Sequence, residues 1–521
     1  MDIYALYFQA VEQSAAKNYD AALKILDEIK VYAPDYEKAY YMEANIWNKL
    51  KNPVKEYYAL EKFLSLVDLS SVQDKNFIAE VFVHLGNILE EDLYLWEKAL
   101  KAYLFALKLA DKKKLIDYVE KNIFFFLNVA ENYSAADFRA IYAECKKVYC
   151  SDSTFPKRFY NHKKIRVGFL SSDFFNHVMI NWGMMLLTKL NKNLFEKYFY
   201  SNGKANDYIT KYLRSNADYW HDIYDLTDSQ VAKLIHDDEI DILFDLNGHT
   251  GESRIHVAAY RPATVQISGI GYMNSTGLDC FDYFLSDIYC AGDESYFTEK
   301  VIKLPHSHIC YKPMIKIELA NNFPPCLKNG FVTFGSFNKL GKMTDSVFIT
   351  WRKILDAVPN SRLILKYTTF DKEYKKNFTI ERLNNLGFDL TRVEMRPFTA
   401  NHLVEYGDID IALDPFPYTG GVTTCEALYM GVPVVSLYGA RHGSRFGLSI
   451  LKNIGIDELA VDSHEAYIER AVALAGDWEL LTILRKNLRT MMEKSPLMDS
   501  ANYIREIEEA FIKILNDERN R

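Results

Sequence analysis

Paired cysteines and a basic excess are both missing from this sequence. The chain of 521 residues has seven cysteines, an odd number, and none of them forms a CxxC pair. We therefore expect neither a disulfide framework nor a metal site, and a reducing cytoplasm as the location. The 62 Lys and Arg residues are outnumbered by 70 Asp and Glu, which gives a net charge of −8. This balance excludes the basic surface that nucleic-acid phosphates require.

Long apolar runs are also missing. No run approaches the roughly 20 residues that a membrane-spanning helix needs, so we expect no membrane insertion. The chain begins MDIYALYFQAVEQ, which lacks a basic segment followed by an apolar one, and we expect no signal peptide. The 49% hydrophobic and 25% charged content is that of globular domains, and the length predicts two to four of them.

Glycine and proline are scarce in the first 150 residues, where the apolar residues follow a helical period. Similar segments open at Asn18, Lys55 and Trp96, about 38 residues apart, and His84-Leu85-Gly86-Asn87 fits the Leu-Gly position of a tetratricopeptide helix. We predict three degenerate tetratricopeptide-like helix pairs within a domain of residues 1–154. Such repeats present a protein-binding surface, and a plain helical packing domain is the alternative.

A glycine turn near the C-terminal end predicts a nucleotide site. A strand-like run over 409–413 ends at Asp414, Gly420-Gly421 follow, and a helix is expected from Cys425 to Met430 before the strand Val434–Leu437. Glycines let the backbone approach a ligand, and the first N–H groups of a helix attract anions. The pattern is typical of a diphosphate site, although an ordinary α/β turn has the same spacing.

Polar residues surround this turn. Thr423 and Thr424 can add hydroxyls or cap the helix. Glu426 lies in the first helical turn, where its carboxylate would repel a phosphate, so we expect it to face a pair of ribose hydroxyls. A buried carboxylate cap is the alternative for Glu426.

Residues 155–318 predict a first α/β half. A strand over 165–170 is followed by the polar turn SSDFFNH, which ends at His177, and by a helix over 180–190. Polar loops with glycine follow later strands and contain His249 in one case and Gly271 and Tyr272 in the other. Polar turns at the ends of parallel strands are where α/β sheets bind ligands. Surface or capping histidines are the alternative.

Residues 319–490 predict a second half, with a strand over 331–336, a helix over 345–357 and a strand over 362–367. Lys339 and Lys342 follow the first strand, where an ammonium group can meet a diphosphate, although both can also be solvated. A helix over 501–515 has an apolar stripe, so residues 491–521 are expected to pack back on the two α/β halves.

Three separated stretches, 171–177, 261–277 and 414–445, resemble the O-GlcNAc transferase/SPINDLY-like glycosyltransferases of family 41, in a bacterial form with tetratricopeptide-like repeats. The resemblance implies an α/β GT-B fold of two Rossmann-like halves, with an all-α tetratricopeptide-like N-terminal domain. It implies that His177 is the active-site histidine, that Lys342 contacts the leaving diphosphate, and that Phe398 and His402 border the base. His249 lies in a cleft loop in that family. Gly271-Tyr272-Met273-Asn274 lacks the family's Pro-Gly.

The same resemblance implies an inverting enzyme that needs no metal or other cofactor. We expect it to transfer GlcNAc from UDP-GlcNAc to Ser or Thr of a protein acceptor bound by the helices. UDP-glucose or GDP-fucose as donor, with N-glucosylation or O-fucosylation, are the alternatives, as is a non-catalytic repeat scaffold. A nucleotide-sugar epimerase fits the fold but needs no repeats. A homodimer is among the assemblies we consider.

Overall fold

The computed structural model describes residues 2–69, 73–146, 153–313 and 323–520. Contacts divide the chain into two units. The first comprises Met1–Phe126 with Lys372–Arg382, and the second comprises Leu127–Asp371 with Leu383–Arg521. Residues 127–146 thus group with the α/β part by contact. The predicted boundary at 318 lies outside the described residues, and the boundaries at 154 and 490 stay predictions.

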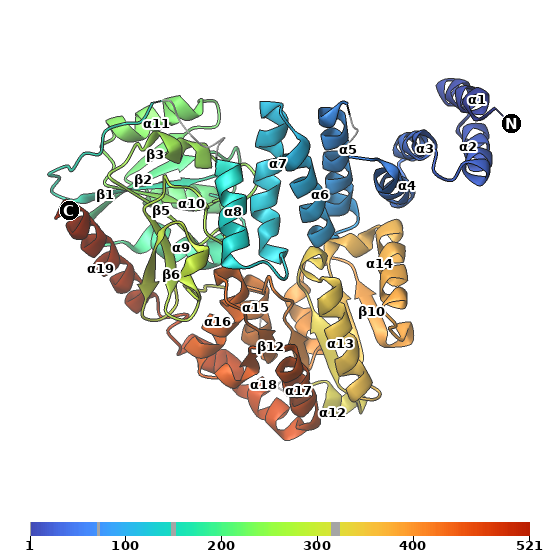
Figure 1. Cartoon of the computed structure of the whole chain (residues 1–521). Coiled ribbons are helices and arrows are strands. Elements are labelled where there is room, and N and C mark those ends of the chain that lie inside the picture. The colour runs from blue at the N-terminus through green and yellow to red at the C-terminus, as the bar shows by residue number, and fades with distance from the viewer. Residues whose placement is uncertain (1, 70–72, 147–152, 314–322, 521) are drawn as a thin grey trace. The chain divides into compact units, whose positions relative to one another are not determined.

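The first unit consists of antiparallel helix pairs (Figure 1). Pairs α1/α2, α3/α4 and α5/α6 pack together as the repeat pattern predicts, and α7 follows them. Ile3 and Glu37, which begin α1 and α3, lie 34 residues apart, the length of a tetratricopeptide repeat. The helices are α1 (Ile3–Ala15), α2 (Tyr19–Tyr32), α3 (Glu37–Lys49), α4 (Pro53–Leu66), α5 (Lys75–Asn87), α6 (Trp96–Leu109) and α7 (Lys113–Phe126).

Gly86 marks the closest approach within the third pair. A Cβ atom there would lie 2.6 Å from the Tyr103 ring of α6, so only glycine fits. The Tyr103 hydroxyl lies within hydrogen-bond distance of two acceptors, 2.8 Å from Asn87 Oδ1 and 2.9 Å from Glu90 Oε2. This contact explains the Leu-Gly signature, because the small residue lets the two helices of a repeat meet.

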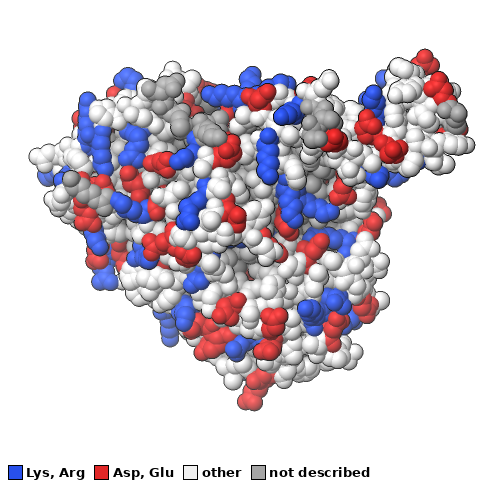
Figure 2. Space-filling model, in the orientation of Figure 1, with Lys and Arg blue, Asp and Glu red and all other residues white. Residues whose placement is uncertain are grey.

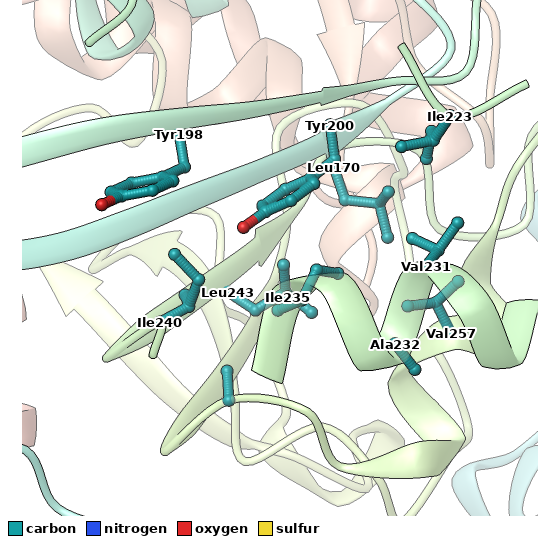
Figure 3. Packing of buried hydrophobic residues seen from close by; sticks show 11 residues of the cluster. Leu170, Tyr198, Tyr200, Ile223, Val231, Ala232, Ile235, Ile240, Leu243 and Val257 are labelled. Carbon is teal, nitrogen blue, oxygen red and sulfur yellow. The ribbon is translucent and has the colours of Figure 1, made fainter. Parts of the chain in front are cut away.

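The first α/β half is one parallel sheet in the order β3-β2-β1-β4-β5-β6-β7. Its core includes Leu170 of β1, Tyr200 of β2 and Ile235 of α11 (Asp228–Asp237), all buried between helix and sheet (Figure 3). Strands β2 and β3 escaped the sequence prediction because charged residues interrupt their apolar pattern. The strands are β1 (Ile165–Ser171), β2 (Phe195–Ser201), β3 (Tyr219–Asp222), β4 (Ile242–Asp245), β5 (Val265–Ser268), β6 (Tyr283–Asp287) and β7 (Lys300–Leu304).

The second half repeats the arrangement with the order β10-β9-β8-β11-β12-β13. The second sheet therefore has the doubly wound 3-2-1-4-5-6 order, and the first sheet has the same order with a seventh strand added; in both, the strand order reverses beside the first strand. This confirms the predicted GT-B architecture of two Rossmann-like halves. The strands are β8 (Thr333–Ser336), β9 (Arg362–Lys366), β10 (Val393–Arg396), β11 (Ile411–Leu413), β12 (Val434–Leu437) and β13 (Ala460–Val461).

Helices cover the faces of this second sheet and connect its strands. Helix α13 (Asp345–Ala357) has the predicted bounds, and α15 (Val422–Tyr429) begins three residues before the predicted Cys425. Part of α14 (Glu373–Asn385) belongs to the helical unit, where the Tyr374 hydroxyl donates to Asp92 at 2.7 Å. The remaining helices of this half are α12 (Cys326–Asn329), α16 (Phe446–Ile454), α17 (His464–Gly476) and α18 (Trp478–Glu493).

The last helix, α19 (Ser500–Arg519), packs on the first half against α9 (Ile180–Lys189) and β7. The Tyr503 hydroxyl donates to His308 O at 3.2 Å, and the Tyr283 hydroxyl donates to Glu518 at 2.9 Å. On the face in Figure 2, basic and acidic side chains of the described residues are interspersed. Among the described residues, no helix is long and apolar enough to cross a membrane.

Candidate nucleotide and acceptor sites

The loops that follow β8 and β11 meet at the point where the strand order of the second sheet reverses. The Thr423 hydroxyl donates to Asn338 Oδ1 at 2.9 Å, and Lys342 Nζ donates to Thr419 O at 2.9 Å. In open α/β sheets, ligands bind in the crevice at this position. The structure therefore brings the predicted lysine and the predicted glycine turn to one place.

Lys342 is half-buried, and its ammonium lies 3.8 Å from the centroid of the Tyr418 ring. Burial lowers the pKa of Lys342 below its ordinary value, and neighbouring Asp414 opposes that shift. Lys339, in contrast, is exposed. A poorly hydrated ammonium interacts strongly with an added anion, because less water screens the two charges.

Asp414 is fully buried at the end of β11 and organises the turn. Its carboxylate accepts from Gly420 N at 2.6 Å and from the Ser436 hydroxyl at 2.7 Å. Burial raises the pKa of Asp414, although these hydrogen bonds favour the ionised form. The sequence prediction named Asp414 only as the end of a strand. Its partners, six and 22 residues away, were not readable from the pattern.

Both glycines of the turn are sterically required. A Cβ on Gly420 would lie 2.7 Å from Asp414 Oδ1, and one on Gly421 would lie 2.4 Å from the Trp182 ring. Trp182 comes from α9 of the first half, so the start of α15 touches that half. Gly421 is the N-cap and no side chain caps the helix. Thr423 therefore lies in the first turn as a hydroxyl donor and does not cap, and Thr424 is buried beside it.

Glu426 of α15 and His402, which lies before β11, are close to each other. Glu426 Oε1 lies 3.2 Å from His402 Nε2, and both side chains are partly exposed. The Phe398 ring is exposed and stacks with the His402 ring at 6.5 Å between centroids. A carboxylate beside an imidazole and an aromatic face can together hold a ribose and a base.

A small pocket lies among these loops. Asn338 and Tyr406 were missing from the prediction, and the Tyr406 hydroxyl donates to Thr423 O at 3.2 Å. No short motif identifies either residue, because each belongs to a different loop from the glycine turn. The pocket is lined by Gly335, Ser336, Phe337, Asn338, Tyr406, Ala412, Leu413, Asp414, Thr423, Thr424, Ala427 and Val434.

The first sheet has a matching site where β1 and β4 end. Asn247 joins the two loops: its Oδ1 accepts from Ser172 N at 2.8 Å, and its Nδ2 donates to Asp173 at 2.7 Å. His177 also lies near Asp173, with its Nδ1 3.6 Å from Asp173 Oδ2. The His177 side chain is 41% exposed. Its separation from Asp173 is that of an ion pair and not of a hydrogen bond, and His177 Nδ1 accepts from Met179 N at 3.4 Å.

His249, Gly271 and Tyr272 lie deeper than the loop pattern indicated. His249 and Tyr272 are both buried, and His249 Nε2 lies 2.7 Å from Thr276 O. Their rings meet edge to face at 5.4 Å. A Cβ on Gly271 would lie 1.7 Å from Leu246 O, so the backbone of this loop is packed directly on the end of β4. His249 and Tyr272 therefore pack in the interior beneath the surface of the loop.

Two doubly wound halves with polar loops at their switch points, and a half-buried lysine beside the glycine turn of the second half, define the GT-B class of nucleotide-sugar glycosyltransferase folds. The family model described as Glycosyl transferase family 41 matches residues 140–312 and 310–507. The chain therefore belongs to glycosyl transferase family 41.

Known relatives agree with this assignment. A probable UDP-N-acetylglucosamine–peptide N-acetylglucosaminyltransferase, SPINDLY from Solanum lycopersicum, is 37% identical over 356 residues, which cover 66% of this chain and 38% of the relative. The corresponding protein SEC from Arabidopsis thaliana is 28% identical over 373 residues, covering 69% of this chain and 38% of the relative. This chain thus spans less than half the length of these relatives.

A solved structure covers nearly the whole chain. The structure of a mutant O-GlcNAc transferase from Thermobaculum terrenum aligns with a TM-score of 0.77 and 27% identity, and covers 99% of this chain and 98% of that one. The likeness therefore includes the helical N-terminal part as well as both α/β halves.

Proposed function

We propose that this protein is an inverting, metal-independent O-glycosyltransferase that moves GlcNAc from UDP-GlcNAc to Ser or Thr of a protein acceptor. The observation that carries the proposal is the convergence of Lys342, the Gly420-Gly421 turn and Glu426 at the switch point of the second half. The names of the relatives and of the Thermobaculum terrenum structure support GlcNAc as the sugar and protein as the acceptor.

On the donor side, the diphosphate lies at the glycine turn and meets the Lys342 ammonium. The bond from the anomeric carbon to the diphosphate breaks, and the negative charge that develops there is stabilised by Lys342 and the start of α15. Glu426 accepts hydrogen bonds from the ribose hydroxyls, and His402 and Phe398 border the base. This arrangement stabilises the leaving group with protein charges, which supports a reaction without a metal.

On the acceptor side, the hydroxyl of Ser or Thr attacks the anomeric carbon from the face opposite the diphosphate, which inverts its configuration. The hydroxyl proton must leave as the new bond forms. His177, which lies beside Asp173, is the residue we assign to this side of the reaction. A kcat/KM profile that loses its acidic limb in His177→Gln supports proton transfer to the imidazole, and an unshifted profile assigns it to positioning.

The helical unit supplies the acceptor-binding surface in this proposal. Its three repeat-like pairs lie outside both α/β halves, and a nucleotide-sugar epimerase would need no such unit. N-glucosylation from UDP-glucose and O-fucosylation from GDP-fucose use the same architecture, so the donor has to be measured.

The test is a donor panel. The full chain is incubated with UDP-GlcNAc, UDP-glucose or GDP-fucose, with and without a Ser/Thr-rich acceptor protein, and free UDP or GDP is measured. We expect UDP release from UDP-GlcNAc that the acceptor increases, and a mass increase of one GlcNAc per site. Preferential GDP release would reassign the donor, and no release from any donor would favour a non-catalytic scaffold.

A further inference from the structure

Three side chains that can bind a metal meet where the two α/β halves touch. Cys290 and His308 come from the first half and His442 from the second, and all three are fully buried. Their ligand atoms lie within 4.8 Å of one another. The cluster shares no residue with the proposed nucleotide site.

The hydrogen bonds leave both imidazoles in the form that binds a metal. His308 Nδ1 lies 2.5 Å from the carboxylate of Asp287, and His442 Nδ1 lies 3.2 Å from Met273 O. An ionised carboxylate and a carbonyl only accept hydrogen bonds, so both Nδ1 atoms carry the proton. The Nε2 atoms of His308 and His442 then hold lone pairs, and both are buried without a hydrogen-bond partner.

Asp287, at the end of β6, holds this geometry. Beyond His308 Nδ1, its carboxylate accepts from Cys290 N at 2.7 Å and from the Ser449 hydroxyl of the second half at 2.8 Å. It thus positions both the loop of Cys290 and the ring of His308. A carboxylate behind a ligating histidine is the usual outer support of zinc sites, where it fixes the tautomer and raises the basicity of the ligand.

Aromatic rings surround the cluster and keep it dry. Phe446 lies 5.1 Å from the His308 ring and 5.2 Å from the His442 ring, and Phe284 lies 5.0 Å from the His442 ring. Two unpartnered nitrogen lone pairs in such a place cost free energy unless a ligand satisfies them. A bound cation removes that cost.

We propose that Cys290, His308 and His442 form a structural Zn²⁺ site that joins the two α/β halves. One thiolate and two imidazoles are the borderline-soft ligands that Zn²⁺ prefers, whereas Mg²⁺ and Mn²⁺ prefer oxygen. The three side chains supply three of four tetrahedral positions, and water or a small ligand takes the fourth. On binding, the Cys290 thiol loses its proton to solvent and its sulfur forms the bond to zinc.

Such a site would also support the loop behind the proposed diphosphate site. His442 begins the turn His442–Ser444, and Gly443 O of that turn accepts from the Thr419 hydroxyl at 3.1 Å. Thr419 O in turn accepts from Lys342. The test of the zinc site does not depend on the proposed function, because it measures metal content and stability and not glycosyl transfer.

The experiment measures zinc directly. The full chain is purified without chelators, and its zinc content is determined by elemental analysis. It is then stripped and titrated with ZnCl₂ alone while Tm is followed. We expect about one Zn²⁺ per chain and, at a hundredfold excess over Kd, a rise in Tm of about 5 °C. Replacement by Co²⁺ should produce thiolate-to-metal absorption bands.

Variants show whether zinc binds at this cluster or at any buried thiol of the protein. Cys290→Ser keeps the size and a hydrogen-bond donor but removes the thiolate, and His442→Gln removes one nitrogen ligand. Both should lose zinc and the zinc-dependent rise in Tm. The matched control is Cys310→Ser, another buried cysteine of the first half outside the cluster. A wild-type protein that binds no zinc on titration, or Cys290→Ser with unchanged stoichiometry, would overturn the proposal.

Discussion

Replacing Lys342 by methionine is the sharpest test of the nucleotide site. Methionine keeps the length of the apolar stem over Tyr418 and removes the ammonium group, so the change leaves packing nearly intact. The ammonium donates to Thr419 O at 2.9 Å and lies 3.8 Å from the Tyr418 ring centroid. Neither contact grows during the reaction, whereas the charge on the leaving diphosphate does.

The expected size of the effect follows from these contacts. A hydrogen bond to a charged group is worth about 1.5–3 kcal/mol, and an ion pair near a protein surface reaches about 4 kcal/mol at 4 Å. Because the charge peaks in the transition state, we expect kcat to fall by about 10²–10³ while the donor KM changes less. Exposed Lys339→Met is the matched comparison and should lose far less.

The assay is UDP release at saturating donor and acceptor, with single-turnover measurements to isolate the chemical step. Circular dichroism and Tm show whether Lys342→Met is folded. A folded Lys342→Met protein whose kcat stays within a few-fold of wild type would refute the assignment of Lys342 to the leaving group. A raised KM with unchanged kcat would instead assign it to ground-state binding.

Four further predictions follow from the same sites. Glu426→Gln should raise the donor KM with less effect on kcat, and unchanged nucleotide affinity in calorimetry would contradict the ribose role. Burial lowers the pKa of Lys342 and an ionised diphosphate favours its charged form, so donor binding should take up a proton and weaken as pH rises; affinity independent of pH would argue against this. Donor turnover should survive EDTA, and rescue by Mn²⁺ would reject metal independence, whereas rescue by Zn²⁺ alone would report on the Cys290 site. Removing residues 1–126 should impair glycosylation of a protein acceptor far more than hydrolysis of the donor, and a folded truncation with full-length rates would exclude acceptor binding by the repeats.

Local pattern determined the elements of this protein. Helix α13 and strand β12 have the bounds predicted from apolar periodicity and from glycine and proline positions. The three repeat pairs were likewise readable, because a tetratricopeptide pair is a contact between neighbouring helices. Gly86 against Tyr103 is an example, with both partners inside one repeat. Short-range contacts leave a short-range signature in sequence.

Tertiary structure decided which loops meet. Thr423 and Asn338 are 85 residues apart, and they bond because β8 and β11 are neighbours in the sheet. Trp182 reaches Gly421 only because the two halves touch. Cys290, His308 and His442 have no motif spacing, and an odd set of cysteines without CxxC argued against any metal. Strand order and the packing of one half on the other create these clusters, and neither is encoded in local periodicity.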